Sequence, residues 1–432
     1  MQRRTLRILA ASAALALTAT ACGGGGGSGG GAQEANAARG PITIWYSNNE
    51  QELKWGKAMV AAWNADHPNE QVTGQEVPAG KSSEEVIGAA ITAGTAPCLV
   101  LNTAPSAVGQ FQRQGGLVNL ADFEGGQAYI EERSGDVAAQ YKAPDGGYYQ
   151  LPWKSNPVMI FYNKDAFTKA GLDPEKPKLS TYAEFLAAAK TIKDKKAADY
   201  AIYPAPSSQF FQAQFDFLPS YAAQTGGKGL VEDNKATFGD QNGIDVFEFW
   251  KSLYDQGLAG KETVQGDSFA DGTAAMAIVG PWAIAVYKGK IDWGSVPVPT
   301  KNGTPAAETY TFSDAKNIGL FTACTNRATA FDLLKFATSE EQDGQLLQVT
   351  GQMPLRQDLA TVYAEYFTKN PAYKQFGDQA SRTVEVPSGP RTVEMLQTIR
   401  DAWTKSVIAG EGDVPAAVTG AADKVTELAG EK

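Results

Sequence analysis

The chain has 432 residues, of which 43% are hydrophobic and 20% are charged, and its formal net charge is −10 at pH 7. This composition is ordinary for a globular protein, and the acidic balance argues against nucleic acid or an anionic membrane surface as a partner. When the first 40 residues are set aside, 392 remain, which is enough for two domain-sized cores.

The first 22 residues have the layout of an export signal. Three arginines precede an uncharged, mostly apolar run at 8–21, which is too short for a stable transmembrane span. The run ends in the letters A-T-A-C, which resemble the lipobox of bacterial lipoproteins, with Ala19 where leucine is usual. This resemblance implies a signal peptide at 1–21 and a diacylated Cys22 that anchors the protein to the membrane. Plain secretion is the alternative, and the Arg3-Arg4 pair leaves the export route open.

Residues 22–40 are predicted to form a flexible tether. Glycine occupies nearly every position from 23 to 31, and the residues up to 40 are small or polar. Such a segment cannot bury enough apolar surface to order itself.

The remaining chain alternates between short apolar strands and amphipathic helices. Strands are expected at 42–46, 99–101, 275–279 and 318–321. Helices are expected after Ser82 and Thr181, each of which begins a capping-box pattern, and also around 55–63 and 247–254. This alternation predicts an α/β architecture with largely parallel sheets.

The search for catalytic patterns is mostly negative. The single histidine, His67, excludes a His-rich zinc site and a conventional Ser-His or Cys-His pair. Gly80-Lys81-Ser82 lacks the upstream glycine of a phosphate-binding loop, because position 75 is glutamine. No cofactor or metal is therefore expected. A glycosidase with two catalytic carboxylates stays open as an alternative, since acidic residues are common throughout.

Cysteine usage predicts a disulfide. Cys22 is assigned to the lipid anchor, which leaves Cys98 and Cys324 as an even pair in an oxidising compartment.

Aromatic and amide residues gather where loops are expected. The set comprises Trp153, Asn156, Gln209, Phe210, Phe211, Gln212 and Trp282. Sugar rings present apolar C–H faces that lie on aromatic rings, and hydroxyl groups that need donors and acceptors, so such a mixture suits a carbohydrate.

Four segments, in order, resemble the signature runs of extracellular solute-binding proteins of family 1, the maltose-binding-protein-like sugar-binding lipoproteins of ABC importers. They lie at 148–172, with its Tyr-Asn-Lys-Asp stretch, at 269–276, at 280–282 with Gly-Pro-Trp, and at 351–354. The resemblance covers essentially the whole mature chain.

The family implies a two-lobe α/β fold of the type II periplasmic-binding-protein class, with a hinge and a ligand cleft between the lobes. The first lobe is expected to comprise 41–153 and 314–366, and the second 154–313 and 367–432. The hinge is expected near Lys154-Ser155 and Phe312-Ser313. Both cysteines of the predicted disulfide map to the first lobe.

The resemblance also implies ligand contacts. First-lobe candidates follow two expected strands: Asn48, Asn49, Glu50, Asn102, Thr103 and Ser106. Asn156 and Trp153 lie near the place where the chain is expected to pass from the first lobe to the second for the first time. The second lobe is expected to contribute Gln209, Phe210, Phe211 and Trp282, with Arg391 from the C-terminal region.

The expected activity is binding without turnover. A mono- or oligosaccharide bridges the lobes of a monomer, and permease subunits of an ABC transporter recognise the closed form at the extracellular face of the cytoplasmic membrane. Two alternatives stay open, a lipid-anchored glycosidase and the same fold with a non-sugar solute. The sequence does not identify the sugar.

Overall fold

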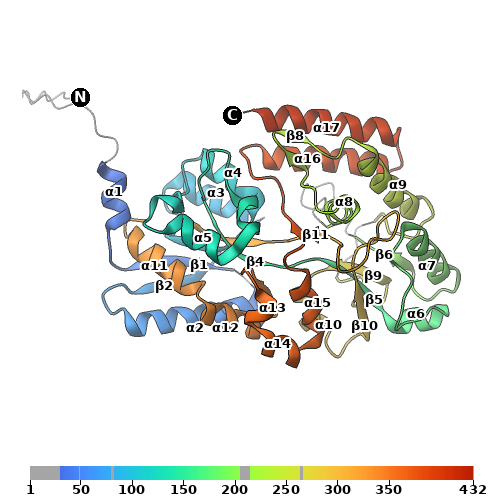
Figure 1. Ribbon diagram of the computed structural model, residues 1–432, viewed down its shortest axis with the longest axis horizontal. Coiled ribbons are helices and arrows are strands. Elements are labelled where there is room, and N and C mark those ends of the chain that lie inside the picture. The colour runs from blue at the N-terminus through green and yellow to red at the C-terminus, as the bar shows by residue number, and fades with distance from the viewer. Residues whose placement is uncertain (1–29, 48, 79–81, 205–214, 263–265, 432) are drawn as a thin grey trace, which may run out of the picture.

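The computed structural model describes residues 30–431, except for 48, 79–81, 205–214 and 263–265. The described residues form two main sheets, each flanked by helices, in two lobes that lie side by side (Figure 1). The strand orders are β13-β4-β12-β3-β1-β2 in the first lobe and β10-β5-β9-β6 in the second. This confirms the predicted two-lobe α/β fold of the periplasmic-binding-protein class.

The first sheet joins segments that are far apart in the chain. Its strands are β1 (Ile42–Tyr46), β2 (Val72–Glu76), β3 (Leu99–Thr103), β4 (Leu151–Ser155), β12 (Lys316–Leu320) and β13 (Met353–Pro354). β1 pairs in parallel with β2 and β3, whereas β12 runs antiparallel between β3 and β4, and β13 antiparallel to β4. The expectation of largely parallel sheets was therefore wrong, because β12 returns from the second lobe and enters the sheet from its opposite end.

The second sheet is also mixed. Its strands are β5 (Met159–Asn163), β6 (Tyr200–Ile202), β9 (Ala274–Val279) and β10 (Trp293–Val296). β5 lies antiparallel to both β9 and β10, and only β6 is parallel to its neighbour. Two small two-stranded sheets join β7 (Val231–Glu232) to β8 (Lys235–Ala236) and β11 (Thr311–Phe312) to β14 (Thr383–Val384).

Helices cover both sheets. Those associated with the first lobe are α1 (Gly30–Ala37), α2 (Glu50–Asp66), α3 (Ser83–Ala93), α4 (Pro105–Arg113), α5 (Gly126–Ser134), α11 (Arg327–Ala337) and α12 (Glu340–Thr350). Those of the second are α6 (Lys164–Ala170), α7 (Tyr182–Asp194), α8 (Phe217–Thr225), α9 (Gln241–Asp255), α10 (Trp282–Tyr287), α16 (Thr392–Trp403) and α17 (Val414–Gly430). Three short helices, α13 (Leu359–Val362), α14 (Ala364–Lys369) and α15 (Pro371–Gln379), lie between the lobes (Figure 1). The 3₁₀ segments are η1 (Leu120–Asp122) and η2 (Gly135–Tyr141), and a π-helical segment, η4 (Thr404–Ile408), follows α16.

Local sequence signals explain where two of these helices begin. Thr181 Oγ1 accepts a hydrogen bond from the Glu184 backbone N–H, and the Glu184 carboxylate accepts one from the Thr181 N–H, so the predicted capping box is complete. Ser82 caps α3 by accepting from the Glu85 N–H. In both cases the cap satisfies backbone donors that have no partner within the helix.

Part of the segment predicted as a tether is helical. From Gly30 to Ala37 the chain is helical, and α1 packs beside α11. Arg39 pairs with Glu70 at 3.1 Å and with Asp332 at 2.5 Å. These contacts hold Arg39 against the first lobe, while the extent of the tether stays a prediction.

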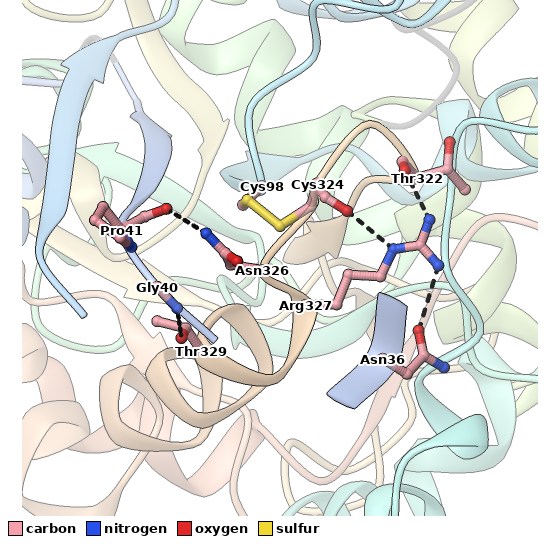
Figure 2. The surroundings of a disulfide bond; sticks show 9 residues. All are labelled: Asn36, Gly40, Pro41, Cys98, Thr322, Cys324, Asn326, Arg327 and Thr329. Carbon is pink, nitrogen blue, oxygen red and sulfur yellow. Dashed lines mark hydrogen bonds between the residues drawn. A yellow bond between two sulfur atoms is a disulfide. The ribbon is translucent and has the colours of Figure 1, made fainter. Parts of the chain in front are cut away.

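The predicted disulfide between Cys98 and Cys324 is confirmed, with an S–S distance of 2.04 Å (Figure 2). Its partners lie next to β3 and β12, which are neighbours in the sheet, and the Phe321 N–H donates to the Cys98 carbonyl at 3.0 Å. Arg327 supports the same loop by donating to the carbonyls of Cys324 and Thr322. Both cysteines therefore lie in the first lobe, and the loop of chain that the bond closes includes the second sheet.

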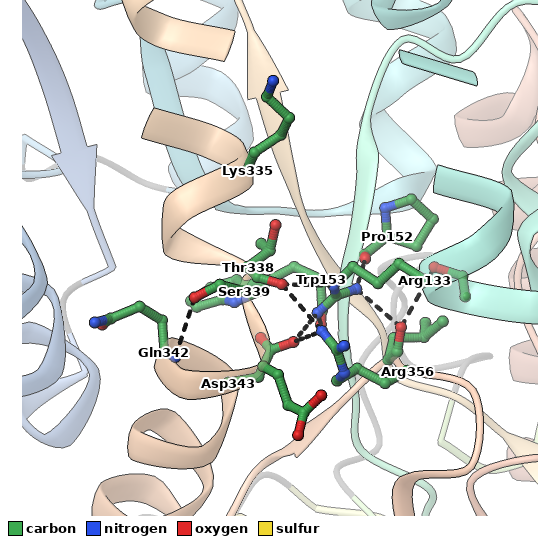
Figure 3. A network of polar contacts seen from close by, with 12 residues as sticks. Arg133, Pro152, Trp153, Lys335, Thr338, Ser339, Gln342, Asp343 and Arg356 are labelled. Atoms are coloured by element: carbon green, nitrogen blue, oxygen red, sulfur yellow. Dashed lines mark hydrogen bonds and ion pairs between the residues drawn. The ribbon is translucent and has the colours of Figure 1, made fainter. Parts of the chain in front are cut away.

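A buried guanidinium ties together several elements of the first lobe (Figure 3). Arg133, at the end of α5, donates to the Asp343 carboxylate at 2.8 Å and to the carbonyls of Pro152 and Trp153 on β4. It also donates to the Leu355 carbonyl, immediately after β13. Asp343 is fully buried and accepts a second charged hydrogen bond from Arg356 at 3.0 Å.

Removing the charge of Asp343 should destabilise the first lobe strongly. In an Asp343→Asn variant two buried or half-buried guanidinium groups lose their counter-charge, and breaking a buried ion pair typically costs about 3–5 kcal/mol. Denaturant unfolding at pH 7 should show this loss. Asp378→Asn, which breaks the exposed Lys374–Asp378 pair, is the matched control and should cost less than about 1 kcal/mol. Equal effects of the two changes would contradict the structural importance of the network.

Candidate functional site

Three chain segments lie side by side where the lobes join, around Asn156, Ser313 and Val384, and we call this place the crossing. The Asn156 N–H donates to the Ser313 carbonyl at 2.7 Å, and the Ser313 N–H donates to the Val384 carbonyl at 2.9 Å. Ser155 and Ser313 also share a hydroxyl hydrogen bond at 3.0 Å. The two predicted hinge positions are therefore adjacent, whereas hinge motion and the lobe boundaries stay predictions.

Two loops of the first lobe bring polar residues toward this crossing. β1 and β3 are parallel neighbours, so the loops that follow them emerge at the same sheet edge, the usual ligand position in open α/β sheets. Asn49 caps α2 by accepting from the N–H groups of Gln51 and Glu52, both at 3.0 Å. After β3, Asn102 has a φ of 75°, a left-handed conformation that asparagine tolerates better than most residues. This turn leads into α4.

The remaining first-lobe candidates differ in exposure. Asn49 and Glu50 are exposed, and Asn102 is half-buried. Thr103 is fully buried and its hydroxyl donates to the Val100 carbonyl, while Ser106 is 6% exposed. The exposed pair and Asn102 are therefore the members of this group best placed for contact with a solute.

A buried polar network connects α2 to the crossing. Glu52, in the first turn of α2, forms a buried ion pair with Lys154 of β4 and accepts from Gln352 Nε2 at 2.7 Å. Asn156 Nδ2 in turn lies 3.4 Å from Gln352 Oε1. Burial lowers the pKa of Lys154, and the nearby Glu52 carboxylate opposes that effect. The loop after β1 and the crossing are thus mechanically coupled.

Asn156 itself has an unsatisfied acceptor. Its side chain is almost fully buried, and Oδ1 has no hydrogen-bond partner among the described residues. Buried acceptors are nearly always paired, because an unpaired one costs about 1–3 kcal/mol. The atom is closed off from solvent in this structure, so a solute could bond to it only if the crossing opened.

From the second lobe, Trp282 approaches the crossing through a chain of aromatic rings. It begins α10 directly after Gly280-Pro281 and is half-buried. Its ring meets Phe215 edge to face, with centroids 6.4 Å apart, and Phe215 meets Phe312 of β11 in the same way at 5.8 Å. The structure thus brings Trp282 near the crossing that also carries Asn156.

Arg391 lies farther out, where the lobes touch. It pairs with Glu394 at 3.0 Å and with Glu431 at 2.8 Å. Glu394 also lies 3.9 Å from Arg113 of α4, in the other lobe. The backbone approach is close here, since a Cβ at Gly109 would lie 1.9 Å from the Gly389 carbonyl oxygen. The charge of Arg391 is already balanced by protein carboxylates.

Several predicted residues are not brought into this arrangement. Trp153 is 1% exposed and packs on Trp55 in the first-lobe core, with ring centroids 5.4 Å apart, because every residue of β4 is buried. Trp153 therefore packs in the first-lobe core, and its contact with ligand stays a prediction. Predictions for Cys22, Asn48, Gln209, Phe210 and Phe211 lie outside the described residues.

The pairing of Glu52 with Lys154 was not predicted from the sequence, although Lys154 was expected near the hinge. Glu52 and Lys154 are separated by about a hundred positions and carry no recognisable pattern. Gln352 did have a signal, because it is part of the Gly-Gln-Met-Pro segment that resembled a family motif.

Glu385 is a second buried acid at the crossing. Its carboxylate accepts from the N–H groups of Ala315 at 3.1 Å and Val386 at 2.8 Å, and it follows β14 directly. Burial raises its pKa to about 8, and these two hydrogen bonds and Lys316 only partly oppose the shift. The group is therefore mostly protonated in the folded protein at neutral pH.

Within the described ranges, no cluster of histidine, cysteine and acidic residues could hold a metal ion. The same residues include no helix with both the length and the apolar character needed to cross a membrane.

Comparison with known proteins identifies relatives. The model of a family described as bacterial extracellular solute-binding protein matches residues 29–375. An sn-glycerol-3-phosphate-binding periplasmic protein of Brucella abortus is 45% identical over 62 residues, which is 14% of each chain. A maltodextrin-binding protein of Bacillus subtilis is 27% identical over 233 residues, or 50% of each chain. The chain thus spans at most half the length of these two curated relatives.

A solved structure shows the same fold over nearly the whole chain. The cyclic alpha-maltosyl-1,6-maltose binding protein from Arthrobacter globiformis superposes with a TM-score of 0.76 at 22% identity. The match covers 90% of this chain and 99% of that one. At this identity the likeness concerns the fold alone.

Glu385 should make stability depend on pH at the crossing. Between about pH 4.5 and 8 the unfolded chain loses this proton and the folded protein keeps it. The free energy of unfolding should therefore fall as pH rises through that window, by up to about 1.4 kcal/mol per pH unit. Glu385→Gln cannot ionise at this position. The unfolding free energy of the variant minus that of the wild type should therefore increase as pH rises from 5 to 8.

Denaturant titrations at several pH values measure this difference. Glu365→Gln, at an exposed position on α14, is the control and should follow the wild type throughout the window. Parallel pH profiles of Glu385→Gln and the wild type would show that Glu385 titrates normally.

Proposed function

The chain belongs to the bacterial extracellular solute-binding protein family, and we propose that it is the substrate-binding lipoprotein of an ABC importer. It captures an extracellular sugar or oligosaccharide by hinge closure and delivers it to the membrane permease. Cys22 carries the lipid anchor, and the protein works as a monomer. The family match over residues 29–375 is the observation that carries this proposal.

The arrangement at the crossing supports a sugar as the solute. Trp282 offers an aromatic surface from the second lobe, and the unpaired Asn156 Oδ1 would add an acceptor when the crossing opens. Asn49, Glu50 and Asn102 add amide and carboxylate groups from the first lobe. Aromatic faces combined with such groups match the two surfaces of a pyranose ring. A relative and a solved structure with the same fold are named for sugars, maltodextrin and cyclic alpha-maltosyl-1,6-maltose, which also supports a sugar as the solute.

Closure follows from where these groups lie. Because they come from both lobes and from the segments between them, a ligand that contacts all of them binds the closed state more tightly than the open one. Such differential affinity shifts the population toward closure. A permease that recognises the closed form would then distinguish loaded from empty protein.

A phosphorylated polyol is the second candidate solute, because the Brucella abortus relative is named for sn-glycerol 3-phosphate. The described residues proposed as contacts carry one negative charge, Glu50, and only Arg391 is basic. Arg391 is already paired with two carboxylates. This charge balance favours a neutral sugar over a phosphate.

Calorimetric titration of the purified mature protein with mono- and oligosaccharides, and with sn-glycerol 3-phosphate, tests the proposal. We expect binding of at least one sugar and recovery of that sugar unchanged after prolonged incubation. Cleavage of the sugar would indicate the glycosidase alternative instead. Binding of sn-glycerol 3-phosphate alone would keep the transport role and overturn the sugar assignment.

Trp282 should be a major contributor to affinity for the sugar found in that screen. Trp282→Ala removes a large aromatic contact, and truncations of such anchors cost about 2–4 kcal/mol. Calorimetry should show the weaker binding while circular dichroism stays native. Trp282→Phe retains an aromatic face and should keep most of the affinity. Unchanged affinity in the alanine variant would make Trp282 a packing residue only.

A further inference from the structure

A cavity of 970 Å³ lies beside the proposed ligand contacts and is not accounted for by them. It is lined by Gln51, which follows the proposed contacts Asn49 and Glu50, and by Ile284 and Ala285, which follow Trp282. We call it the tyrosine groove, after Tyr363 between α13 and α14, Tyr366 of α14 and Tyr373 of α15.

The tyrosine groove is walled by both lobes. Gln51 of α2 and the end of α12 at 348–350 belong to the first lobe. Ile284, Ala285 and Lys288, on or next to α10, and Trp293 of β10 belong to the second. α14 and α15 lie between them (Figure 1). A solute in the groove would therefore contact both lobes, as would a solute at the crossing.

The aromatic walls of the groove are held in place by packing. Trp293 stacks on the buried Phe161, with centroids 4.5 Å apart and planes 18° from parallel. Tyr366 and Tyr373 contact each other with centroids 5.9 Å apart, and the Tyr363 hydroxyl donates to the Glu340 carbonyl at 2.7 Å. These rings are half-buried, so each keeps some surface open toward the groove.

Polar tips in the groove are left free. Among the described residues, the hydroxyls of Tyr366 and Tyr373 and the indole N–H of Trp293 have no hydrogen-bond partner. Further polar groups complete the lining: Gln51, Gln348, Asn370, Lys288, Lys369 and Glu365. Lys369 and Glu365 neutralise each other at 2.5 Å. Half-buried aromatic rings with free donors and amide groups match a carbohydrate far better than an apolar or strongly charged solute.

We propose that the tyrosine groove is a second binding region for the same ligand, which holds sugar units that extend beyond Trp282, so that the protein selects long oligosaccharides over short ones. This inference rests on the proposed sugar-binding function. The groove and the proposed contacts adjoin in sequence on both walls, at 49–51 and at 282–285. A chain that continues past Trp282 along α10 would enter it.

The test compares short and long members of three oligosaccharide series by calorimetry: maltose with maltoheptaose, cellobiose with cellohexaose, and xylobiose with xylohexaose. In the series that binds, the long member should bind the wild type at least tenfold more tightly than the short one. Tyr366→Ala should reduce this long-to-short ratio at least fivefold. Tyr200→Ala, which removes a half-buried tyrosine from β6 on the second sheet, is the matched control and should leave the ratio unchanged.

A second readout keeps the test decisive if Tyr366→Ala does not fold. Fluorine NMR of protein labelled with 5-fluorotryptophan, with the Trp293 signal assigned from Trp293→Phe, should show that signal moving with the long sugar only. The groove proposal is overturned if Tyr366→Ala leaves the long-to-short affinity ratio unchanged, or if the Trp293 signal does not shift when the long sugar binds. The sugar-binding function stands in both cases. If no member of any series binds and the calorimetric screen of mono- and oligosaccharides is also empty, the proposed function fails, and the groove proposal fails with it.

Discussion

The buried guanidinium of Arg133 is the interaction on which the geometry of the first lobe depends. One planar group donates to the carbonyls of Pro152 and Trp153 on β4 and of Leu355 after β13, and to the carboxylate of Asp343 on α12. It thereby fixes the strand that leads into the first crossing against the segment that leads out of the sheet. A lysine could not replace it, because its ammonium has only three donors and no planar fork.

A second buried ion pair, between Lys154 of β4 and Glu52 of α2, connects the same strand to the helix that follows β1. Glu52 and Lys154 are both withdrawn from water, which costs several kcal/mol for each ion and is repaid only where hydrogen bonds complete the pair. Gln352 supplies one of those bonds and also reaches Asn156. A ligand that disturbs Asn156 therefore acts on a group already coupled to α2. The pair is better understood as a device that fixes relative position than as a source of stability.

The fold was predictable from the sequence where local patterns decide it. The strand at 42–46 was expected from a short apolar run, and the structure confirms its bounds as β1. The directions of the strands were not predictable in this way, because β12 joins β3 and β4 from across more than 150 residues of chain. No local pattern records which distant strand will fill a gap in a sheet.

For the candidate site too, some residues could be recognised from local sequence and others only from the folded chain. Trp282 was recognisable because it stands in a Gly-Pro-Trp segment, and the structure places it near the crossing. Trp153 belonged to an equally suggestive segment but is core, since only the sheet on both its sides reveals its burial. Glu385 carried no signal at all, because its raised pKa arises from burial by segments that meet only in the folded chain.

The energetics of closure argue for a ligand with many contacts. Where the lobes touch in this structure, the ion pair between Arg113 and Glu394 is partly exposed and loose at 3.9 Å, and pairs of this kind are worth at most about 1 kcal/mol. Such a contact cannot lock the lobes together. To convert a population that is 1% closed into one that is 99% closed, a ligand must favour the closed state by about 5.5 kcal/mol. If Trp282 contacts the ligand as proposed, this one aromatic anchor supplies only part of that difference, and the proposed closure then needs further contacts on both sides of the crossing. A ligand that reaches across the lobes is therefore better able to drive closure than a small one held by a single wall.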